Sequence, residues 1–429
     1  MAEMDAFERR VAGTLLHYAD DVSVAVDAAA VAHRVALEHP RRRVGVLPWR
    51  LAAIPRVAWV LLLLAALITA MVAGMLVVGS QPVRKLQAVV PAFNCPPGST
   101  PDAPGPVDQA RPPSWGYMAF DRALGKIVLV GGRENVGPVE TMETWTFDVC
   151  TNAWAAMHPA SRPDVRAFGM LAYDAAARQT ISMSPDSGRV WAYDLASDTW
   201  TMRAGAPKTM RAGRPTAPGA LRLVYDSVAA RVVVLQVGSP RLMWSFDSVA
   251  GVWEPVDQDR DVWYPSDSSD LHFLLAYDAS VDRLVGYDRG EVRLFDLRTG
   301  TWSPPGTRSP SFGYGGYYSF GGEIAYDEAA QRTVLFSIGD VIAYDAAADR
   351  WETLYGTAFD QPNACGIRPE CRVQPSMVYD PINERLVVYG GNVQTGAEWW
   401  GPSDDVLAFD TRTREWTVLL EASEAQPAP

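Results

Sequence analysis

Few residues in this sequence have the types and spacing that metal or acid–base catalysis requires. C-terminal to residue 79 the chain has four cysteines but only two histidines, His158 and His272, which do not cluster. The cysteines lack the paired C-x-x-C spacing of a zinc site, and no Walker loop, G-x-G-x-x-G, G-x-S-x-G or H-E-x-x-H motif occurs. The motifs therefore predict no metal site, no cofactor and no catalytic residue.

Aromatic side chains are the stronger candidates for a binding site, because they stack on sugars and anchor protein partners. They gather in three long stretches between the regular parts of the chain. The seven candidates are Trp263, Tyr264, Tyr314, Tyr317, Tyr318, Trp399 and Trp400. Whether they contact a ligand or pack inside the fold depends on the elements that position them.

Those elements repeat six times. Each unit contains two steps of an aromatic residue followed by aspartate, and the first aspartates lie 49–53 residues apart at Asp121, Asp174, Asp226, Asp278, Asp327 and Asp380. Tryptophan follows the second aspartate by six positions in every unit, at Trp154, Trp200, Trp253, Trp302, Trp351 and Trp416. A basic residue follows the first aspartate by five positions, or by four at Arg178. Aspartate accepts hydrogen bonds from tight-turn amides and tryptophan supplies apolar area, so we interpret both as structural.

Each unit divides into four short strands. An apolar run such as LLAYD precedes the first aspartate, a β-branched run such as RLVVYGG follows it, and a third run such as VRLFD precedes the second. The tryptophan begins the fourth strand. Four antiparallel strands form one blade, so residues 114–420 predict an all-β, six-bladed β-propeller.

The glycine pairs Gly131-Gly132 and Gly390-Gly391, the aromatic-aspartate steps and the spaced tryptophans together resemble the Kelch-repeat family, although the middle four units lack the glycine pair. The resemblance implies a Kelch-type propeller but little about activity, because such propellers include binding modules and a few enzymes similar to galactose oxidase. A copper site of that kind needs clustered histidines, which this sequence lacks. Residues 184–191 resemble the Asp box of sialidases, and we interpret them as a hairpin turn.

Loop lengths distinguish the two faces of the predicted propeller. The turns between first and second strands, and between third and fourth, are short and nearly constant, and strand alternation puts both sets on one face. The other connections are long and carry the seven aromatic candidates, so we expect function on that second face. The alternative is that these side chains pack over the central channel.

A membrane span precedes the propeller. Residues 57–79 contain no charge over 23 positions, enough for one transmembrane helix. Arginines at 41, 42, 43, 50 and 56 precede the span closely, whereas only Arg84 and Lys85 follow it, so residues 1–56 are expected to face the cytoplasm. The protein is therefore predicted to be a single-pass cell-membrane protein with an extracytoplasmic propeller.

Charge and cysteine usage agree with this division. Residues 1–56 carry a formal charge of +1 and the rest −13, so a nucleic-acid partner is not expected. All four cysteines lie beyond the span, which suits an oxidising compartment. Cys365 and Cys371 share one connection and are expected to pair. Cys95 would then pair with Cys150 and fasten the chain to the turn face of the first blade.

The flanking segments complete the predicted organisation. Residues 1–56 predict a tail of two short helices, which either holds the chain at the membrane or docks a cytoplasmic regulator. Residues 80–113 are rich in proline and predict an extended stalk. Residues 421–429 predict a disordered tail.

Two functions fit these observations. The favoured one is a binding or interaction module for a glycan or an envelope protein. The alternative is an extracytoplasmic glycan-processing enzyme, since the paired carboxylates of glycoside chemistry lie 5–10 Å apart in space and leave no motif.

Overall fold

The computed structural model describes residues 94–423, apart from residue 115 and the segments 132–142, 164–169, 185–186, 208–220, 237–241, 258–272, 311–321, 357–370 and 395–399. These residues belong to the C-terminal of two units into which the chain divides, residues 83–429. No helix occurs among them, and thus none that is apolar and long enough to cross a membrane. The predicted span at residues 57–79 and the predicted helices of residues 1–56 lie outside the described part.

The described part is all-β and consists mainly of four-stranded antiparallel sheets. The first sheet contains β1 (Gly116–Asp121), β2 (Lys126–Gly131), β3 (Glu143–Asp148) and β4 (Ala153–Met157). The second contains β5 (Leu171–Asp174), β6 (Gln179–Met183), β7 (Val190–Asp194) and β8 (Thr199–Ala204). The third contains β9 (Leu221–Asp226), β10 (Arg231–Gln236), β11 (Leu242–Asp247) and β12 (Val252–Asp257).

The remaining strands repeat this plan with one addition. The fourth sheet contains β13 (Leu274–Asp278), β14 (Arg283–Asp288), β15 (Glu291–Asp296) and β16 (Thr301–Trp302). The fifth contains β17 (Glu323–Asp327), β18 (Arg332–Ser337), β19 (Asp340–Asp345) and β20 (Arg350–Tyr355). The sixth contains β22 (Ser376–Asp380), β23 (Arg385–Tyr389), β26 (Val406–Asp410) and β27 (Glu415–Leu420). A separate three-stranded sheet contains β21 (Arg372–Val373), β24 (Asn392–Gln394) and β25 (Trp400–Pro402).

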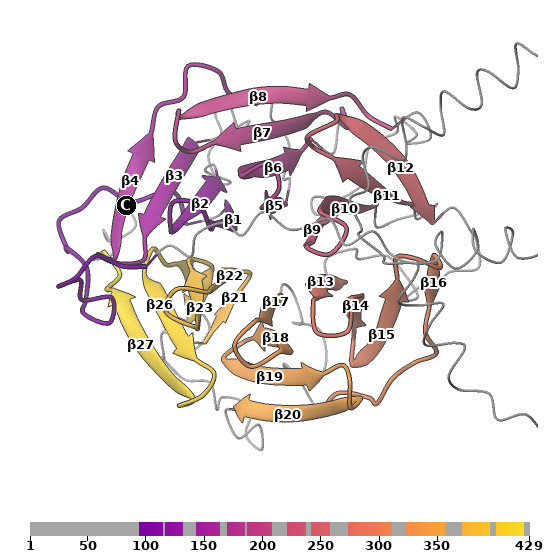
Figure 1. Ribbon diagram of the computed structural model, residues 1–429. Coiled ribbons are helices and arrows are strands. Elements are labelled where there is room, and N and C mark those ends of the chain that lie inside the picture. Colours follow the sequence, from indigo (N-terminus) through magenta and orange to yellow (C-terminus); the bar gives the residue numbers. More distant parts are fainter. Residues whose placement is uncertain are drawn as a thin grey trace, which may run out of the picture. The chain divides into compact units, whose positions relative to one another are not determined.

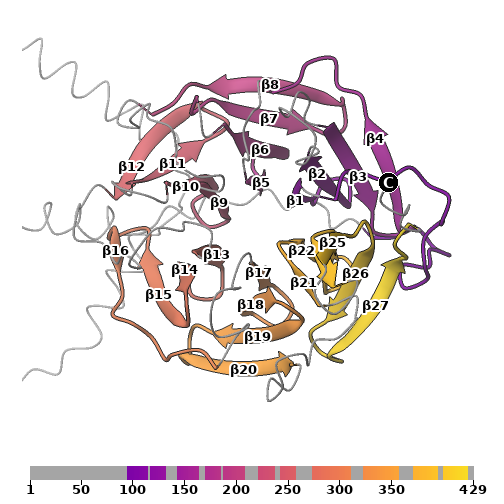
Figure 2. The same cartoon turned by 180° about the vertical axis from the view of Figure 1, so that it is seen from behind.

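The four-stranded sheets surround a common axis, as Figures 1 and 2 show from opposite sides. Their innermost strands contact one another in the cyclic order β1, β5, β9, β13, β17, β22 and back to β1. Apolar clusters fill the spaces between neighbouring sheets, for example Ala172 and Ile181 against Leu221 and Leu223. This arrangement is that of a β-propeller.

The turns at one end of the strands share a single construction. The repeated aspartate accepts hydrogen bonds from backbone amides two or three residues later, as Asp226 does from Val228 and Ala229 at 2.9 Å. The fourth residue after each aspartate has a positive φ in all twelve turns, including Gly125 at 63° and Ala230 at 56°. The interpretation of the aspartates as turn residues is therefore confirmed. We call this end of the sheets the turn face, and the opposite end the loop face.

The repeated tryptophans each occupy the second position of a fourth strand. Each packs on the aromatic residue of the second aromatic-aspartate step, with ring centroids 4.7–5.0 Å apart in all six sheets. The two residues are direct cross-strand partners, as Phe147 and Trp154 are. This pairing explains the constant offset of six positions, because the turn between the two strands has a constant length.

The basic residue at the start of a second strand is also structural. Lys126 pairs with Asp148 at 3.5 Å and Arg283 with Asp296 at 2.9 Å, each within one sheet. Arg231 and Arg332 likewise pair within their own sheets, with Glu254 and Glu352. Arg178 departs from the common offset because it holds the positive-φ turn position, and its strand begins at Gln179.

Candidate functional site

The predicted aromatic site lies almost wholly outside the described residues. Trp263, Tyr264, Tyr314, Tyr317, Tyr318 and Trp399 all belong to undescribed segments. Trp400 is the exception, because it begins β25 and its backbone pairs with Gln394 of β24. The structure therefore neither gathers nor separates the seven candidates.

The connections that carry these aromatics start and end on the loop face, as predicted. The three-stranded sheet belongs to this face, since its strands lie in the connection before β22 and in that between β23 and β26. A fully buried ion pair holds it, with both guanidinium Nη atoms of Arg372 donating to the Asp405 carboxylate at 2.9 and 2.8 Å. Ser403 and the carbonyl oxygen of Gly390 complete the network at 2.6 and 2.9 Å. Trp400 is thus carried on a strand whose sheet has a fixed position on the loop face.

Polar residues also occur on the inner strands at the loop-face end, where apolar runs are expected. The position four residues before the first aspartate is occupied by Tyr117, Met170, Arg222, Leu274, Glu323 and Ser376. We call these six residues the axial collar, because each lies within the first two positions of an innermost strand or, in the case of Met170, directly before it. Four of them, Tyr117, Arg222, Glu323 and Ser376, carry groups that can hydrogen-bond.

Two collar residues also join neighbouring sheets. Arg222 is buried, and its Nε donates to the carbonyl oxygen of Phe273 in the next sheet at 2.7 Å. The Ser376 hydroxyl of β22 donates to the carbonyl oxygen of Gly116 in β1 of the neighbouring first sheet. These contacts hold both side chains in place, so any group they offer to a ligand is already oriented.

Glu323 is the collar residue with the most altered chemistry. Its side chain is half-buried at the start of β17. Burial raises the pKa of Glu323 to about 8, although the positive charge of Arg222 opposes the shift. At neutral pH this carboxyl is therefore mostly protonated and donates as well as accepts hydrogen bonds. Perturbed carboxyls of this kind are common at binding and catalytic sites.

Metal chemistry has no support in the described part of the chain. No group of three or more histidine, cysteine, aspartate or glutamate side chains there is arranged to hold an ion. The polar groups of the collar suit recognition of hydroxyl or carboxylate groups through hydrogen bonds.

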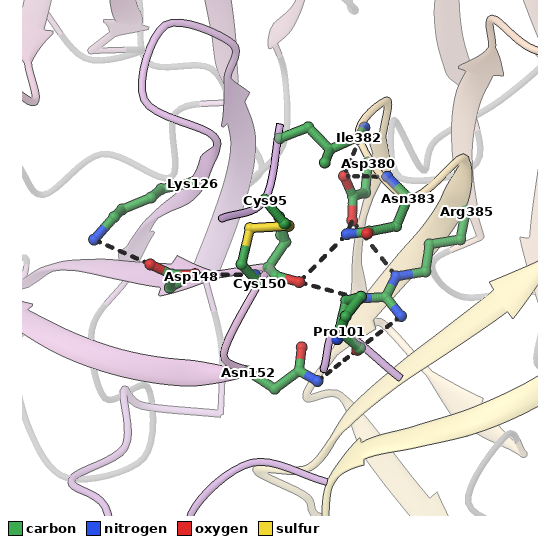
Figure 3. Close-up of a disulfide and its surroundings, with 11 residues drawn as sticks. Cys95, Pro101, Lys126, Asp148, Cys150, Asn152, Asp380, Ile382, Asn383 and Arg385 are labelled. Atoms are coloured by element: carbon green, nitrogen blue, oxygen red, sulfur yellow. Dashed lines mark hydrogen bonds and ion pairs between the residues drawn. A yellow bond between two sulfur atoms is a disulfide. The ribbon is translucent and has the colours of Figure 1, made fainter. Parts of the chain in front are cut away.

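The disulfide prediction is confirmed for one pair. Cys95 and Cys150 are bonded, with Cα atoms 5.4 Å apart, and Cys150 lies in the β3–β4 turn. The bond therefore fastens the chain to the turn face of the first sheet, as Figure 3 shows. Cys371 is buried and disulfide-bonded. Its pairing with Cys365 stays a prediction, since Cys365 lies outside the described residues.

The segment that resembles an Asp box is confirmed as a turn between β6 and β7. Ser184 donates its amide to the carbonyl oxygen of Arg189 at 2.9 Å, and Gly188 donates to that of Ser184 at 2.7 Å. It joins the second and third strands of its sheet and lies apart from the collar in sequence.

Comparison with known proteins identifies fold likeness only. No protein-family model matches the chain, and no curated protein matches it. A protein of unknown function from Bacteroides thetaiotaomicron matches at 12% identity with a TM-score of 0.44, over 66% of this chain and 70% of its own. TolB from Acinetobacter baumannii matches at 15% identity and 0.43, over 71% and 65%. YjhT matches at 13% identity and 0.41, over 73% and 99%.

Sequence reasoning missed Arg222 and Glu323. The available signal was a charged residue inside an otherwise apolar first run, in LRLVYD and EIAYD. In the sequence of a single strand, such a charged residue is interpreted as solvent-exposed. Only the closed ring shows that this strand is one of the innermost ones.

Proposed function

We propose that this chain is a membrane-anchored, six-bladed Kelch-type propeller that binds a glycan or another envelope protein outside the cytoplasm. The apolar segment at residues 57–79 and the arginines before it support this location. The six repeated units and their common turns support the Kelch-type assignment. Residues 1–56 would then hold the chain at the membrane or meet a cytoplasmic regulator.

The difference between the two faces carries the proposal of a binding site. On the turn face, the aspartates accept hydrogen bonds from backbone amides in twelve similar turns. Because these turns are alike and use their polar groups internally, this face has few features that could recognise a specific ligand. The loop face has long connections of unequal length, seven aromatic candidates and the polar members of the axial collar. Binding sites concentrate on such variable connections above a rigid scaffold.

The proposed ligand contacts combine aromatic stacking with hydrogen bonding. Aromatic faces pack on sugar rings or on apolar protein side chains, whereas the protonated carboxyl of Glu323 offers a donor to hydroxyl or carboxylate oxygens. A glycan presents both kinds of surface, and so does a protein loop.

The test is a glycan array and an envelope pull-down with the purified full-length protein in detergent. A variant with Trp399, Trp400, Tyr317 and Tyr318 changed to Ala should lose binding at least tenfold. Val249→Ala is the matched control, since Val249 is 73% exposed on the turn face and should leave binding unchanged. Full binding by the fourfold variant would reject the loop-face aromatics as the site.

The alternative, a glycan-processing enzyme, is favoured by one observation. A carboxyl with a pKa near 8, such as that of Glu323, is protonated at neutral pH as a general acid must be. Incubation of any bound glycan with the protein distinguishes the two functions. If the wild-type protein releases products from a bound glycan and the Glu323→Gln variant does not, the function is that of a glycan-processing enzyme and not of a binding module.

A further inference from the structure

The ring has one junction that the chain itself does not connect. Each four-stranded sheet is built from one continuous stretch of the chain, so no strand from one end of the chain completes the sheet at the other end. The other neighbouring sheets follow one another directly along the chain. We call the junction between the first and sixth sheets the seam, where β1 contacts β22.

The seam also lacks a contact found at other junctions of the ring. At three other junctions the tyrosine before the first aspartate bonds to the preceding sheet: the hydroxyls of Tyr173, Tyr225 and Tyr379 accept from the amides of Ala123, Ala176 and Ala329. At the remaining two junctions the tyrosines are Tyr277, whose hydroxyl donates to Asp282 of its own turn at 2.6 Å, and Tyr326. The equivalent residue at the seam is Phe120, which has no hydroxyl group. Something else must secure the turns of the two sheets there.

Residues 94–113, which we call the strap, bridge the two sheets. On the first sheet, the Asn152 Nδ2 group donates to the carbonyl oxygens of Pro101 and Ala103 at 2.7 and 2.8 Å. On the sixth sheet, the strap amide of Gly105 donates to the carbonyl oxygen of Leu419 at 2.7 Å. The strap thus lies along both edges of the seam, although the sequence predicted an extended stalk here. Residues 80–93 of that predicted stalk lie outside the described part.

Further contacts follow the strap towards the loop face. The Tyr389 hydroxyl donates to the carbonyl oxygen of Pro112 at 2.8 Å. Arg111 contacts Asp404 at 3.3 Å and the carbonyl oxygen of Glu421 at 2.5 Å, so the start of the predicted tail is also held. Gly391 donates to the carbonyl oxygen of Ser114 at 3.2 Å. The strap therefore contacts the sixth sheet from the turn face to the loop face.

The disulfide and a charged cluster fix the turn-face end of the strap, as Figure 3 shows. Arg385 of the sixth sheet contacts Asp102 of the strap at 3.0 Å and its own Asp380 at 3.5 Å. Asn383 donates to the carbonyl oxygen of Val149, next to Cys150, at 3.3 Å. These contacts connect the strap, the β3–β4 turn of the first sheet and the β22–β23 turn of the sixth sheet.

We infer that the strap, locked by the Cys95–Cys150 disulfide, adds to the apolar contacts between the first and sixth sheets and stabilises the closed ring at the seam, and that a dithiol reductant unlocks it. Cys95 is half-buried whereas Cys150 is buried, so attack occurs at the Cys95 sulfur. One thiolate of the reductant forms a mixed disulfide with Cys95 and releases the Cys150 thiolate, which takes a proton. The second thiolate then closes the oxidised reductant and frees Cys95, so the two cysteines together gain two electrons and two protons.

The test is hydrogen exchange of the full-length protein in detergent, resolved by peptide. In the double variant Cys95→Ser and Cys150→Ser, amides of β1, β22 and β27 should exchange at least tenfold faster, while those of β9 to β16 on the far side stay unchanged. Dithiol treatment of the wild type should give the same pattern. The same treatment of the double variant should add nothing at the seam, which separates this bond from that of Cys371.

A second variant disturbs the strap without touching the disulfide. A Cβ at position 105 would overlap the carbonyl oxygen of Asn152, so Gly105→Ala should displace the strap and reproduce the local change. Gly205→Ala is the matched control, because a Cβ there meets nothing within 4 Å. Equal acceleration in all sheets, or unchanged exchange at the seam in both the double variant and Gly105→Ala, would overturn the inference.

Discussion

Glu323 occupies a position at which the six repeated units all differ. At the same position the other five units have tyrosine, methionine, arginine, leucine and serine, none of which is acidic. Placing a carboxylate among the innermost strands costs hydration, so the proton stays on up to a higher pH.

The pH dependence of stability should report this proton. The pKa of Glu323 is about 8 in the folded protein, above its ordinary value of 4.5. Between these pH values the folded state holds a proton that the unfolded state has released, so the free energy of unfolding falls as pH rises. With these two pKa values the loss between pH 6 and pH 9 is about 3 kcal/mol, and we expect Glu323→Gln to abolish it, as measured by urea unfolding at each pH.

Glu352 provides the control of opposite sign. Hydrogen bonds from Arg332 and Arg414 hold the pKa of Glu352 below its ordinary value. Glu352→Gln should therefore lose stability at neutral pH and lose less at acid pH. A Glu323→Gln variant with the same pH profile as the wild type would show that its proton is not linked to folding.

At the scale of the element, the recurring unit is the four-residue turn after each aspartate. Every one of the twelve ends in a positive-φ residue, yet most of these residues are not glycine. A side chain in this conformation costs about 1 kcal/mol, which the aspartate cap and the packing of the strands must offset. The turns are therefore specified by the aspartate more than by glycine, and this is why an aromatic-aspartate pattern is easier to find than a glycine pattern.

Ala230 gives a direct test of this cost. It is half-buried with φ of 56° in the β9–β10 turn. Ala230→Gly should raise the free energy of unfolding by about 0.5–1 kcal/mol, because glycine adopts this φ without strain. Ala229→Gly, one residue earlier and without a positive φ, should instead lower it by about 0.5 kcal/mol. Thermal unfolding of both variants provides the measurement, and a loss of stability in Ala230→Gly would contradict the account.

At the scale of the whole molecule, the proposed topology puts the propeller outside and residues 1–56 inside. Five arginines precede the apolar segment closely and only two basic residues follow it. Protease added to intact cells, or to spheroplasts where an outer envelope blocks access, should remove residues 114–420 and spare the N-terminal tail. A tag at each end, detected after treatment and again after detergent lysis, makes the measurement. Protection of the propeller until lysis would reverse the orientation.

The sequence by itself determined the local and repeated features. The aspartates, the cross-strand tryptophans and the constant turns depend on neighbours within about ten residues, so their spacing survives in a linear pattern. The Cys95–Cys150 pair could be predicted as well, because only four cysteines are present. Repetition makes these signals strong, since six independent copies show the same offsets.

Only the tertiary structure decided which residues meet across the ring. In the sequence, Phe120 holds the same position in its unit as the tyrosines of the other five units. Only the closed ring shows that the sheet preceding that of Phe120 is the sixth, at the far end of the chain. Arg222 and Glu323 lie about a hundred positions apart, and the sequence does not relate them. Prolines at 96, 97, 112 and 113 suggest an extended segment, and the strap is indeed without strands, but its partners Asn152 and Leu419 are brought together by ring closure alone. Such contacts depend on packing between elements that are distant in the chain. The spacing of residues in the sequence therefore does not predict them.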